Sequence, residues 1–185
     1  MFHEPAQFDF TQTLETNWRL IRQECEEVLS KNWIVWPEPK IGGGGGWTAF
    51  GLFLHGRRHE ANCALCPETA RLAQSIPGMT MAGFSSLAPG VRLRPHTGYS
   101  NRVLRCHLGL IVPDSCGLRV GEETRQWEEG KCLVFDDTYE HSAWNDSEKT
   151  RIVLLVDFLK EGKNPDRSLP ASVVLAMQQS TRETR

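Results

Sequence analysis

Residues 79–112 read MTMAGFSSLAPGVRLRPHTGYSNRVLRCHLGLIV, and this stretch decides the fold. It contains short apolar segments of strand length, separated by turn residues such as Ala88-Pro89-Gly90. The pattern continues to Phe158 and predicts eight strands: Thr80–Leu87, Val91–Arg94, Val103–Val112, Gly117–Val120, Glu123–Trp127, Lys131–Phe135, Glu140–Trp144 and Arg151–Phe158. Short strands at this spacing are typical of an all-β sandwich or barrel.

The chain before residue 79 has a different pattern. Apolar residues within Thr11–Lys31 recur at spacings of three and four, which predicts a helix, and a second, shorter helix is expected over Pro67–Ile76. Trp47–Leu54 is predicted to be a strand. The five consecutive glycines Gly42–Gly46 predict a loop, which is either a linker or a flexible flap beside a ligand site.

The length of 185 residues suits one domain. We expect a helical region over residues 1–40, a β core over 47–158 and a C-terminal tail over 160–185. The first ten residues are expected to be irregular, whereas the segment Ala171–Gln179 favours a short helix within the tail.

Charge and hydropathy exclude several classes of partner. The chain carries 21 basic and 23 acidic residues, a formal net charge of −2, so no nucleic-acid partner is expected. No apolar run approaches the about 18 residues of a membrane span, and the N-terminus has no apolar targeting segment. These features predict a soluble cytoplasmic protein without a membrane partner.

Six cysteines are present, and two of them, Cys63 and Cys66, form a single CxxC pair close to His55 and His59. A structural zinc site and a redox pair are both open, although zinc usually has four clustered ligands. We favour a third interpretation, in which the two cysteines are reduced, half-buried thiols in a turn that leads into a helix.

Three histidines, His96, His107 and His141, lie at or near the ends of predicted strands. Neutral imidazole is the commonest metal ligand and suits iron, zinc, copper and nickel. In an antiparallel barrel, His96 and His141 can face each other although they are far apart in sequence. A single histidine in a β protein is nevertheless more often an ordinary hydrogen-bonded polar group than a ligand.

Arginines strengthen the case for a site. Arg151 begins an otherwise apolar strand, and a buried cation needs a partner. That partner is either an anionic co-substrate or one of the carboxylates of Asp136, Asp137 and Asp157. Arg105 lies two residues before His107, so both side chains share one face of a strand. Imidazoles together with arginines fit a metal and an anionic co-substrate.

Five segments together resemble the catalytic domain of the aspartyl/asparaginyl β-hydroxylases. They are Trp47–Leu52, Pro95–Gly98, Leu104–Leu110, Trp127–Lys131 and Phe135–His141, and the resemblance extends from about Trp47 to Asp157. It implies a double-stranded β-helix, or jelly-roll, with N-terminal helices packed on it. It also implies an enzyme that uses Fe(II), 2-oxoglutarate and O2.

The resemblance further implies roles for individual residues. It assigns iron to His96 and His141, 2-oxoglutarate to Arg151, Ser85, His107 and Arg105, and the substrate to Arg105 and Trp47. In this scheme Arg151 and Ser85 bind the distal carboxylate of 2-oxoglutarate. Arg105 and His107 are catalytic residues beside the co-substrate, and Arg105 provides a cationic pocket for the substrate.

One position departs from most non-haem iron oxygenases, which place a carboxylate ligand two residues after the first histidine. Here that position is Gly98, a departure that the family shares. Water could complete the iron shell. Asp136 or Asp137 could also serve as a ligand, although hydrogen-bonding support of His141 is the favoured role for them.

The expected reaction is hydroxylation of the β-carbon of Asp or Asn residues in a peptide or protein. Three alternatives use the same chemistry on a small molecule: a free amino acid, a natural-product peptide or a lipid acyl chain. A further alternative, from another class, is a jelly-roll that binds a metal or ligand without turnover.

Overall fold

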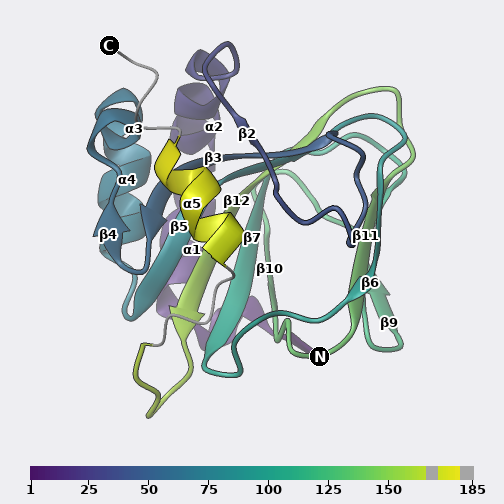
Figure 1. The fold of residues 1–185 in the computed structure, drawn as a ribbon. Coiled ribbons are helices and arrows are strands. Elements are labelled where there is room, and N and C mark those ends of the chain that lie inside the picture. Colours follow the sequence, from purple (N-terminus) through teal and green to yellow (C-terminus); the bar gives the residue numbers. More distant parts are fainter. Residues whose placement is uncertain (166–170, 180–185) are drawn as a thin grey trace.

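The computed structural model describes residues 1–165 and 171–179, which form two antiparallel sheets facing each other (Figure 1). The large sheet has the order β1 (Phe2–His3), β10 (Cys132–Phe135), β7 (Val103–Ile111), β12 (Arg151–Leu159), β5 (Met79–Leu87), β3 (Trp47–Leu54) and β2 (Ile34–Val35), and β4 (Arg57–Arg58) pairs with β3. The small sheet has the order β6 (Arg92–His96), β11 (His141–Asn145), β8 (Cys116–Val120) and β9 (Glu123–Arg125). This arrangement confirms the predicted jelly-roll.

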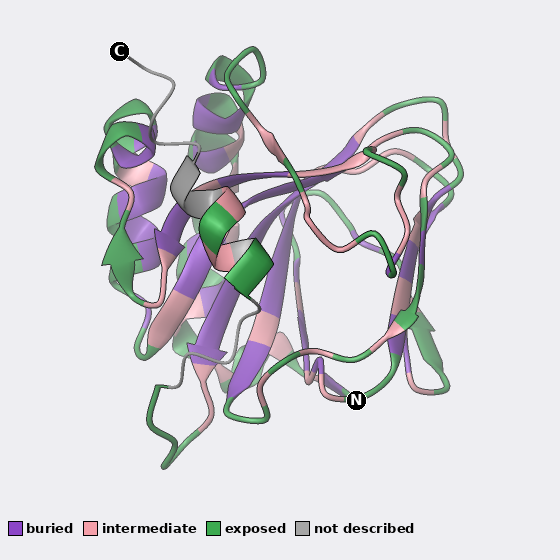
Figure 2. Cartoon of the chain, viewed as in Figure 1, coloured by how far each residue is buried: buried purple, intermediate pink, exposed green. Residues whose placement is uncertain are grey.

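The strands of the large sheet have two different faces because successive side chains alternate. On β7, Leu104, Cys106 and Leu108 belong to a core that also includes Leu14 and Ile21 of the helices. Most of the large sheet is therefore buried, as the purple strands in Figure 2 show. The other face carries polar residues of β7 toward the small sheet, and this face holds the candidate site.

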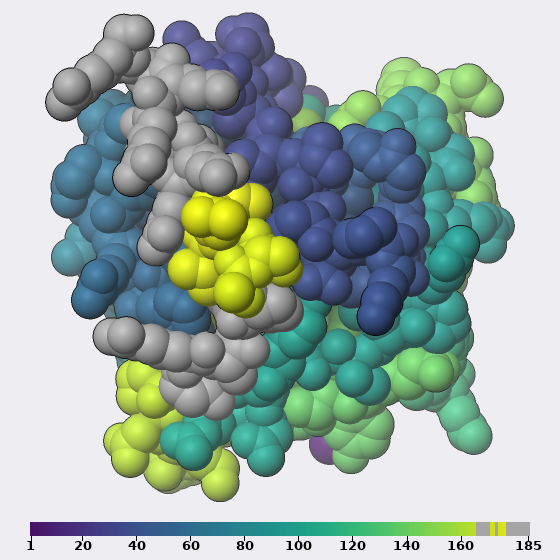
Figure 3. All heavy atoms as spheres, in the orientation of Figure 1, coloured from purple at the N-terminus to yellow at the C-terminus, as the bar shows by residue number. Residues whose placement is uncertain are grey.

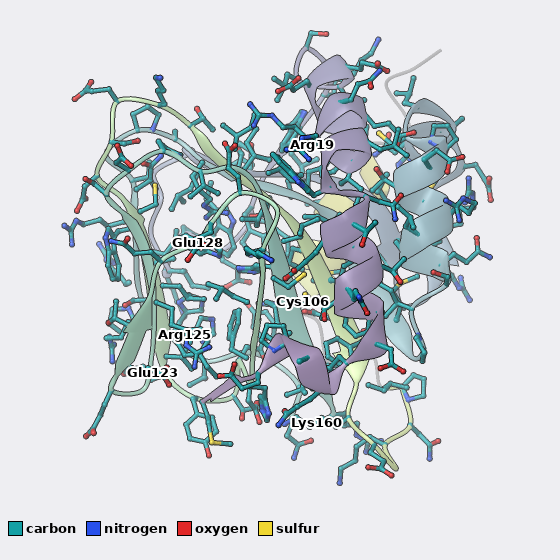
Figure 4. The ribbon with its side chains drawn as sticks, turned by 180° about the vertical axis from the view of Figure 1, so that it is seen from behind. Arg19, Cys106, Glu123, Arg125, Glu128 and Lys160 are labelled. Atoms are coloured by element: carbon teal, nitrogen blue, oxygen red, sulfur yellow. The ribbon has the colours of Figure 1, made fainter. Side chains whose placement is uncertain are left out.

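Helices cover the large sheet on the side away from the small sheet. They are α1 (Asp9–Thr16), α2 (Trp18–Glu27), α3 (Glu60–Leu65) and α4 (Pro67–Gln74), and Figure 4 shows α1 and α2 in front of the strand that bears Cys106. The short helix α5 (Ala171–Gln179) contacts β3 and lies on the opposite side of the large sheet (Figures 1 and 4). None of the described helices combines the length and the apolar character that crossing a membrane requires.

The strand predictions are confirmed, with every end within two residues of its expected position. The expected helix over Thr11–Lys31 is instead two helices that meet at Asn17. The Asn17 carbonyl starts α2 by accepting the N–H groups of Leu20 and Ile21, while its side-chain amide donates to the carbonyl of Thr13. Asparagine competes with helical hydrogen bonding in this way, so it interrupts the pattern.

Other features in the N-terminal half were missed in the sequence. Residues 1–10 are not irregular, because Phe2–His3 pairs with β10 and Pro5–Gln7 forms a 3₁₀ turn. Helix α3 was not expected, and its first turn is capped by the His59 ring, which accepts the N–H of Asn62 at 3.2 Å. Of the expected tail, residues 166–170 and 180–185 lie outside the described part of the chain.

The glycine run is part of the barrel and does not link two domains. Gly42, Gly43, Gly44 and Gly45 all have positive φ angles, between 51° and 104°, which residues with a side chain rarely adopt. The loop is tied at both ends: the Ile41 carbonyl accepts the N–H of Arg94, and the Gly46 carbonyl accepts the N–H of Ala88. Figure 3 shows this dark blue segment lying over the face between α5 and the small sheet. The loop therefore lies close to β6.

Cys63 and Cys66 are free thiols beside the turn into α4, as predicted, but they are fully buried between α2, α3 and β3 and not half-buried. Each is protonated and donates to a carbonyl, Cys63 to Leu52 at 3.2 Å and Cys66 to Glu24 at 3.8 Å. Burial raises the pKa of Cys66 to about 12. Among the described residues no three His, Cys, Asp or Glu side chains form a candidate metal site.

Candidate active site

His96 and His141 lie side by side on the small sheet, as paired residues of β6 and β11, with ring centroids 4.2 Å apart. Each Nδ1 contacts a backbone carbonyl, that of Arg94 at 2.7 Å and that of Tyr139 at 3.0 Å. A carbonyl only accepts hydrogen bonds, so both Nδ1 atoms carry the proton. Both Nε2 atoms therefore keep a free lone pair, the form in which imidazole binds a metal.

Burial lowers the pKa of both rings. The pKa of His141 falls to about 3 because of burial and the neighbouring His96, and the pKa of His96 is lowered mainly by burial. Both imidazoles are therefore neutral at neutral pH, which removes proton competition for a metal.

Arg151 is the buried cation of the site, with only 2% of its surface exposed. Its Nη1 donates to the Ser85 carbonyl at 3.3 Å, and its guanidinium lies 4.5 Å from the centre of the Trp127 ring. Burial lowers the pKa of Arg151 to about 10, so it stays charged at neutral pH. Its Nε is buried without a hydrogen-bond partner among the described residues.

The alternative in which Arg151 pairs with an aspartate was wrong. Asp136 is bound by Lys160, whose Nζ lies 2.6 Å away, and Asp137 and Asp157 both pair with Arg105. No described carboxylate neutralises Arg151. A buried guanidinium without a carboxylate is costly, which favours an anionic ligand at this position.

His107 is a hydrogen-bond donor in this site. Its Nδ1 lies 3.2 Å from Nε1 of Trp127, and an indole N–H can only donate, so the proton of the neutral ring is on Nε2. That Nε2 is buried without a partner among the described residues. Burial and, next, the charge of Arg151 hold the pKa of His107 well below its usual range.

Ser85 and Trp47 lie beside Arg151. The Trp47 indole donates to Oγ of Ser85 at 3.2 Å, which leaves the hydroxyl proton of Ser85 available for another acceptor. Trp47 also stacks on Trp36, with centroids 5.0 Å apart, and lies 6.5 Å from the His96 ring. A narrow recess next to Ser85 is lined by both tryptophans and by Leu155.

Arg105 is in a different setting from the one that the sequence suggested. Its guanidinium makes two hydrogen bonds to Asp157, at 2.7 and 2.8 Å, and lies 3.2 Å from Asp137. Although burial opposes it, the two carboxylates raise the pKa of Arg105. Two carboxylates thus already balance its charge, so Arg105 is not a free cation for a substrate carboxylate.

Gly98 and Asp137 explain how a glycine comes to occupy the usual ligand position. A Cβ on Gly98 would lie only 2.2 Å from a carboxylate oxygen of Asp137, so the Asp137 carboxylate fills the space of a side chain at position 98. Asp137 is 2% exposed, and its Oδ1 has no partner among the described residues. Burial, opposed by Arg105, raises its pKa to about 6. Asp136 is held by Lys160 and Thr138, so Asp137 is the aspartate beside the site.

Eight residues form a closed series of contacts, which we call the contact ring; seven of the contacts join side chains, and the one between Ser85 and Arg151 is made by the Ser85 carbonyl. In order they are His96, Trp47, Ser85, Arg151, Trp127, His107, Phe135 and His141, which returns to His96. All of the predicted site residues except Arg105 belong to it. Trp127 and Phe135 lie in segments that carry the family resemblance, but neither was assigned a role there, because only the tertiary contacts reveal their roles.

The contact ring fits a metal and a dicarboxylic acid. Two neutral imidazoles present free Nε2 atoms, a donor set that suits iron and other first-row metals. His107 and Arg151 contribute buried N–H groups without partners, at Nε2 and Nε respectively. Buried polar atoms are nearly always hydrogen-bonded, so these groups indicate where an acceptor of a ligand belongs.

The fold and the site define a jelly-roll protein with a two-histidine site. A solved prolyl-4-hydroxylase from Pseudomonas putida has a similar fold, with a TM-score of 0.54 and 17% sequence identity over 80% of this chain and 88% of that chain. The family model for aspartyl/asparaginyl β-hydroxylase matches residues 15–161. The chain therefore belongs to the aspartyl/asparaginyl β-hydroxylase family, which confirms the resemblance found in the sequence.

Two curated relatives are named hydroxylases. The chain is 42% identical over 175 residues to the ornithine lipid ester-linked acyl 2-hydroxylase of Rhizobium tropici, covering 89% of this chain. It is 38% identical over 178 residues to the human aspartyl/asparaginyl β-hydroxylase, covering 91% of this chain. The chain spans 62% of the length of the Rhizobium relative and 24% of that of the human relative.

Proposed function

We propose that the protein is an Fe(II)- and 2-oxoglutarate-dependent dioxygenase that hydroxylates a C–H bond of its substrate. The contact ring is the observation that carries this proposal, because it joins two metal-competent imidazoles to a buried arginine that has no carboxylate partner. The family membership supports the same chemistry.

Each residue has a defined task in this proposal. His96 and His141 hold the iron through Nε2. Arg151 and the hydroxyl of Ser85 bind the distal carboxylate of 2-oxoglutarate, and the Nε2–H of His107 binds an oxygen at the other end of the molecule. When bound, iron and O2 supply the oxidation that converts 2-oxoglutarate to succinate and CO2 and the substrate C–H to C–OH.

The rest of the chain orients these groups and keeps water away. Phe135 and Trp127 are buried, with 1% and 3% of their surface exposed, and they separate the polar atoms from solvent. Which carbon reacts depends on which one is held next to the iron, so specificity is a matter of positioning.

The charges near the site favour a neutral group next to the reacting carbon. The Arg105 guanidinium is already bound by Asp157 and Asp137, so a substrate carboxylate would meet a net negative cluster. We therefore propose a carbon next to an uncharged carbonyl as the target. The β-carbon of an asparagine in a peptide or protein fits this description, and so does a lipid acyl chain, the substrate type named for the Rhizobium relative.

Turnover of 2-oxoglutarate tests the proposal. The purified chain with Fe(II), O2 and 2-oxoglutarate is offered Asn peptides, matched Asp peptides and acylated amino-acid lipids, and succinate and product mass are measured. We expect succinate together with a product heavier by one oxygen, more with Asn peptides or lipids than with Asp peptides. Both products should be lost in His141→Ala and Arg151→Ala.

If the chain binds iron and 2-oxoglutarate but forms no succinate with any of these substrates, the result supports the non-catalytic alternative. If Asp peptides react best, the charge argument built on Arg105 is wrong while the reaction class stands.

A further inference from the structure

Trp127 lies between Arg151 and His107 in the contact ring. It is 3% exposed and follows β9 in a segment that is fastened to β7. The Gly109 carbonyl accepts the N–H of Gly130 at 2.9 Å, and the Lys131 carbonyl accepts the N–H of Gly109 at 3.0 Å. A Cβ on Gly109 would lie 2.2 Å from the Glu128 carbonyl, so only glycine allows this close approach. These contacts hold the segment that follows Trp127 against β7.

The indole N–H selects the tautomer of His107. A neutral imidazole carries its proton on either nitrogen, and only one arrangement leaves Nδ1 able to accept from Trp127 at 3.2 Å. The alternative tautomer would place two N–H groups against each other. The hydrogen bond to Trp127 therefore makes the buried Nε2 of His107 a donor to any ligand.

The ring face of the same indole supports Arg151. The guanidinium carbon lies 4.5 Å from the ring centre, within the range of a cation–π interaction. Among the described residues no carboxylate competes for this cation, so the indole stabilises the charge while Nε of Arg151 stays available as a donor. Asp157 and Asp137 hold Arg105 quite differently, by consuming its donors.

Trp47 acts in the same way on Ser85, the residue whose hydroxyl also binds the co-substrate in the proposed function. Its N–H donates to Oγ of Ser85 at 3.2 Å, so the Ser85 hydroxyl must direct its own proton elsewhere. Two indoles therefore set the direction of two donors, one on each side of Arg151.

We propose that Trp127 is a positioning residue for the dicarboxylic co-substrate: its N–H keeps His107 as an Nε2–H donor, and its ring face holds the Arg151 guanidinium. This inference rests on the proposed function for the identity of the ligand. The position of Trp127 in the contact ring and its two distinct contacts carry it.

Binding of 2-oxoglutarate to the Mn(II)-loaded full chain tests the proposal without turnover. Trp127→Phe keeps a ring under Arg151 and removes the N–H, whereas Trp127→Leu removes both. We expect the dissociation constant, measured by calorimetry, to rise about 5-fold in Trp127→Phe, as for a lost hydrogen bond. It should rise roughly 10-fold further in Trp127→Leu, as for a lost buried cation–π contact.

Trp33→Phe is the matched control, because it also loses one indole hydrogen bond, from Nε1 to the Val28 carbonyl at 2.8 Å. Trp33 packs in the core on the helix-covered side of the large sheet, so 2-oxoglutarate binding should be unchanged. In turnover, Trp127→Phe should raise the KM for 2-oxoglutarate and leave kcat within about 2-fold. The reason is that the substitution weakens binding of 2-oxoglutarate and does not remove a group that takes part in the chemical step.

The tautomer of His107 gives a readout that needs no metal and no ligand. Nitrogen-15 shifts of the His107 ring should show a single Nε2–H form in the wild type and a mixture of tautomers in Trp127→Phe. An unchanged tautomer together with unchanged 2-oxoglutarate binding in Trp127→Phe would overturn the proposal.

The proposed function and the positioning role of Trp127 can each be contradicted without the other. If the wild-type chain does not bind 2-oxoglutarate, the proposed function fails, and the nitrogen shifts still decide whether Trp127 sets the tautomer. If Trp127→Leu does not fold, Trp127→Phe and the nitrogen shifts are sufficient for the test.

Discussion

At the scale of single residues, two buried arginines have opposite surroundings. Arg105 is held by Asp157 and Asp137, whereas Arg151 has an aromatic ring, one backbone carbonyl and no carboxylate. A paired buried charge is a structural element, and its loss leaves the partner uncompensated. An unpaired buried charge destabilises the fold, which favours a ligand-binding role for it.

This contrast predicts opposite effects on stability. In Arg151→Met we expect the free energy of unfolding, measured by urea titration with a chelator present, to be unchanged or up to about 2 kcal/mol higher, because a lone buried cation is removed. Binding of 2-oxoglutarate should be abolished in the same variant.

Arg105→Met is the matched control and should lose about 3–5 kcal/mol, because Asp157 and Asp137 are left as buried carboxylates without a cation. Equal destabilisation by both substitutions would show that Arg151 is a structural residue and would count against its role as a ligand-binding group.

At the scale of elements, the helices support the large sheet through a small number of specific bonds. Glu24 of α2 is buried and accepts three hydrogen bonds at the start of α4: from the N–H of Glu68 at 2.9 Å, from the N–H of Thr69 at 2.7 Å and from its hydroxyl at 2.6 Å. A carboxylate at a helix N-terminus also interacts favourably with the helix dipole. Glu24 therefore joins two helices, and no sequence pattern within either helix reveals it.

Glu24→Ala should lower the free energy of unfolding by about 2–4 kcal/mol, because it leaves three donors unsatisfied in a buried position. Glu24→Gln should cost less, since one amide oxygen still accepts. Chemical denaturation measures both effects.

The dissociation constant of 2-oxoglutarate should not change in either folded Glu24 variant, because the contact ring lies on the other side of the large sheet. A large change in that constant would mean that the helical layer controls the site and does not only support it.

At the scale of the whole molecule, the fold holds three neutral histidines close together, and this makes its stability depend on pH. The pKa values of His96, His107 and His141 are all lowered by burial, to about 3 for His141. The unfolded chain therefore binds more protons than the folded chain as the pH falls below about 6.5. The stabilising contribution of these groups is present above that pH and is lost below it.

Asp137 acts in the opposite direction. Its pKa is raised to about 6, so Asp137 is protonated at a higher pH in the folded chain than in the unfolded chain. The folded chain therefore gains stability from Asp137 as the pH falls below about 6. The buried pair His107 and His141 changes stability by at most about 2.7 kcal/mol per pH unit, and Asp137 offsets at most about 1.4 kcal/mol of that. The histidines win.

We therefore expect the metal-free protein to lose stability steadily between pH 6.5 and about pH 5, followed as a falling urea midpoint in a chelating buffer. His141→Gln should flatten this slope, because one group that titrates only in the unfolded chain is removed. A midpoint that does not change over this range would contradict the depressed pKa values.

The sequence by itself determined the class of fold and the main chemical groups of the site. Alternating apolar residues and turn residues specify strands locally, because side chains of a strand alternate between two faces. Five segments, three of which contain His96, His107 and His141, were sufficient to identify the family, which the family model confirms. The break at Asn17 and the edge strand Phe2–His3 were missed, because a local pattern does not show where competing hydrogen bonds are made.

Only the tertiary structure decided how these groups are arranged and charged. The Asp137 carboxylate fills the space that a side chain at position 98 would need, although the two residues are distant in the chain. The charge of Arg105 is balanced by Asp157 and Asp137. The role of Trp127 depends on its contacts with His107 of β7 and Arg151 of β12. The physical reason is that charge balance, tautomer and burial are properties of neighbours in space, and strand pairing brings these neighbours together from distant parts of the sequence.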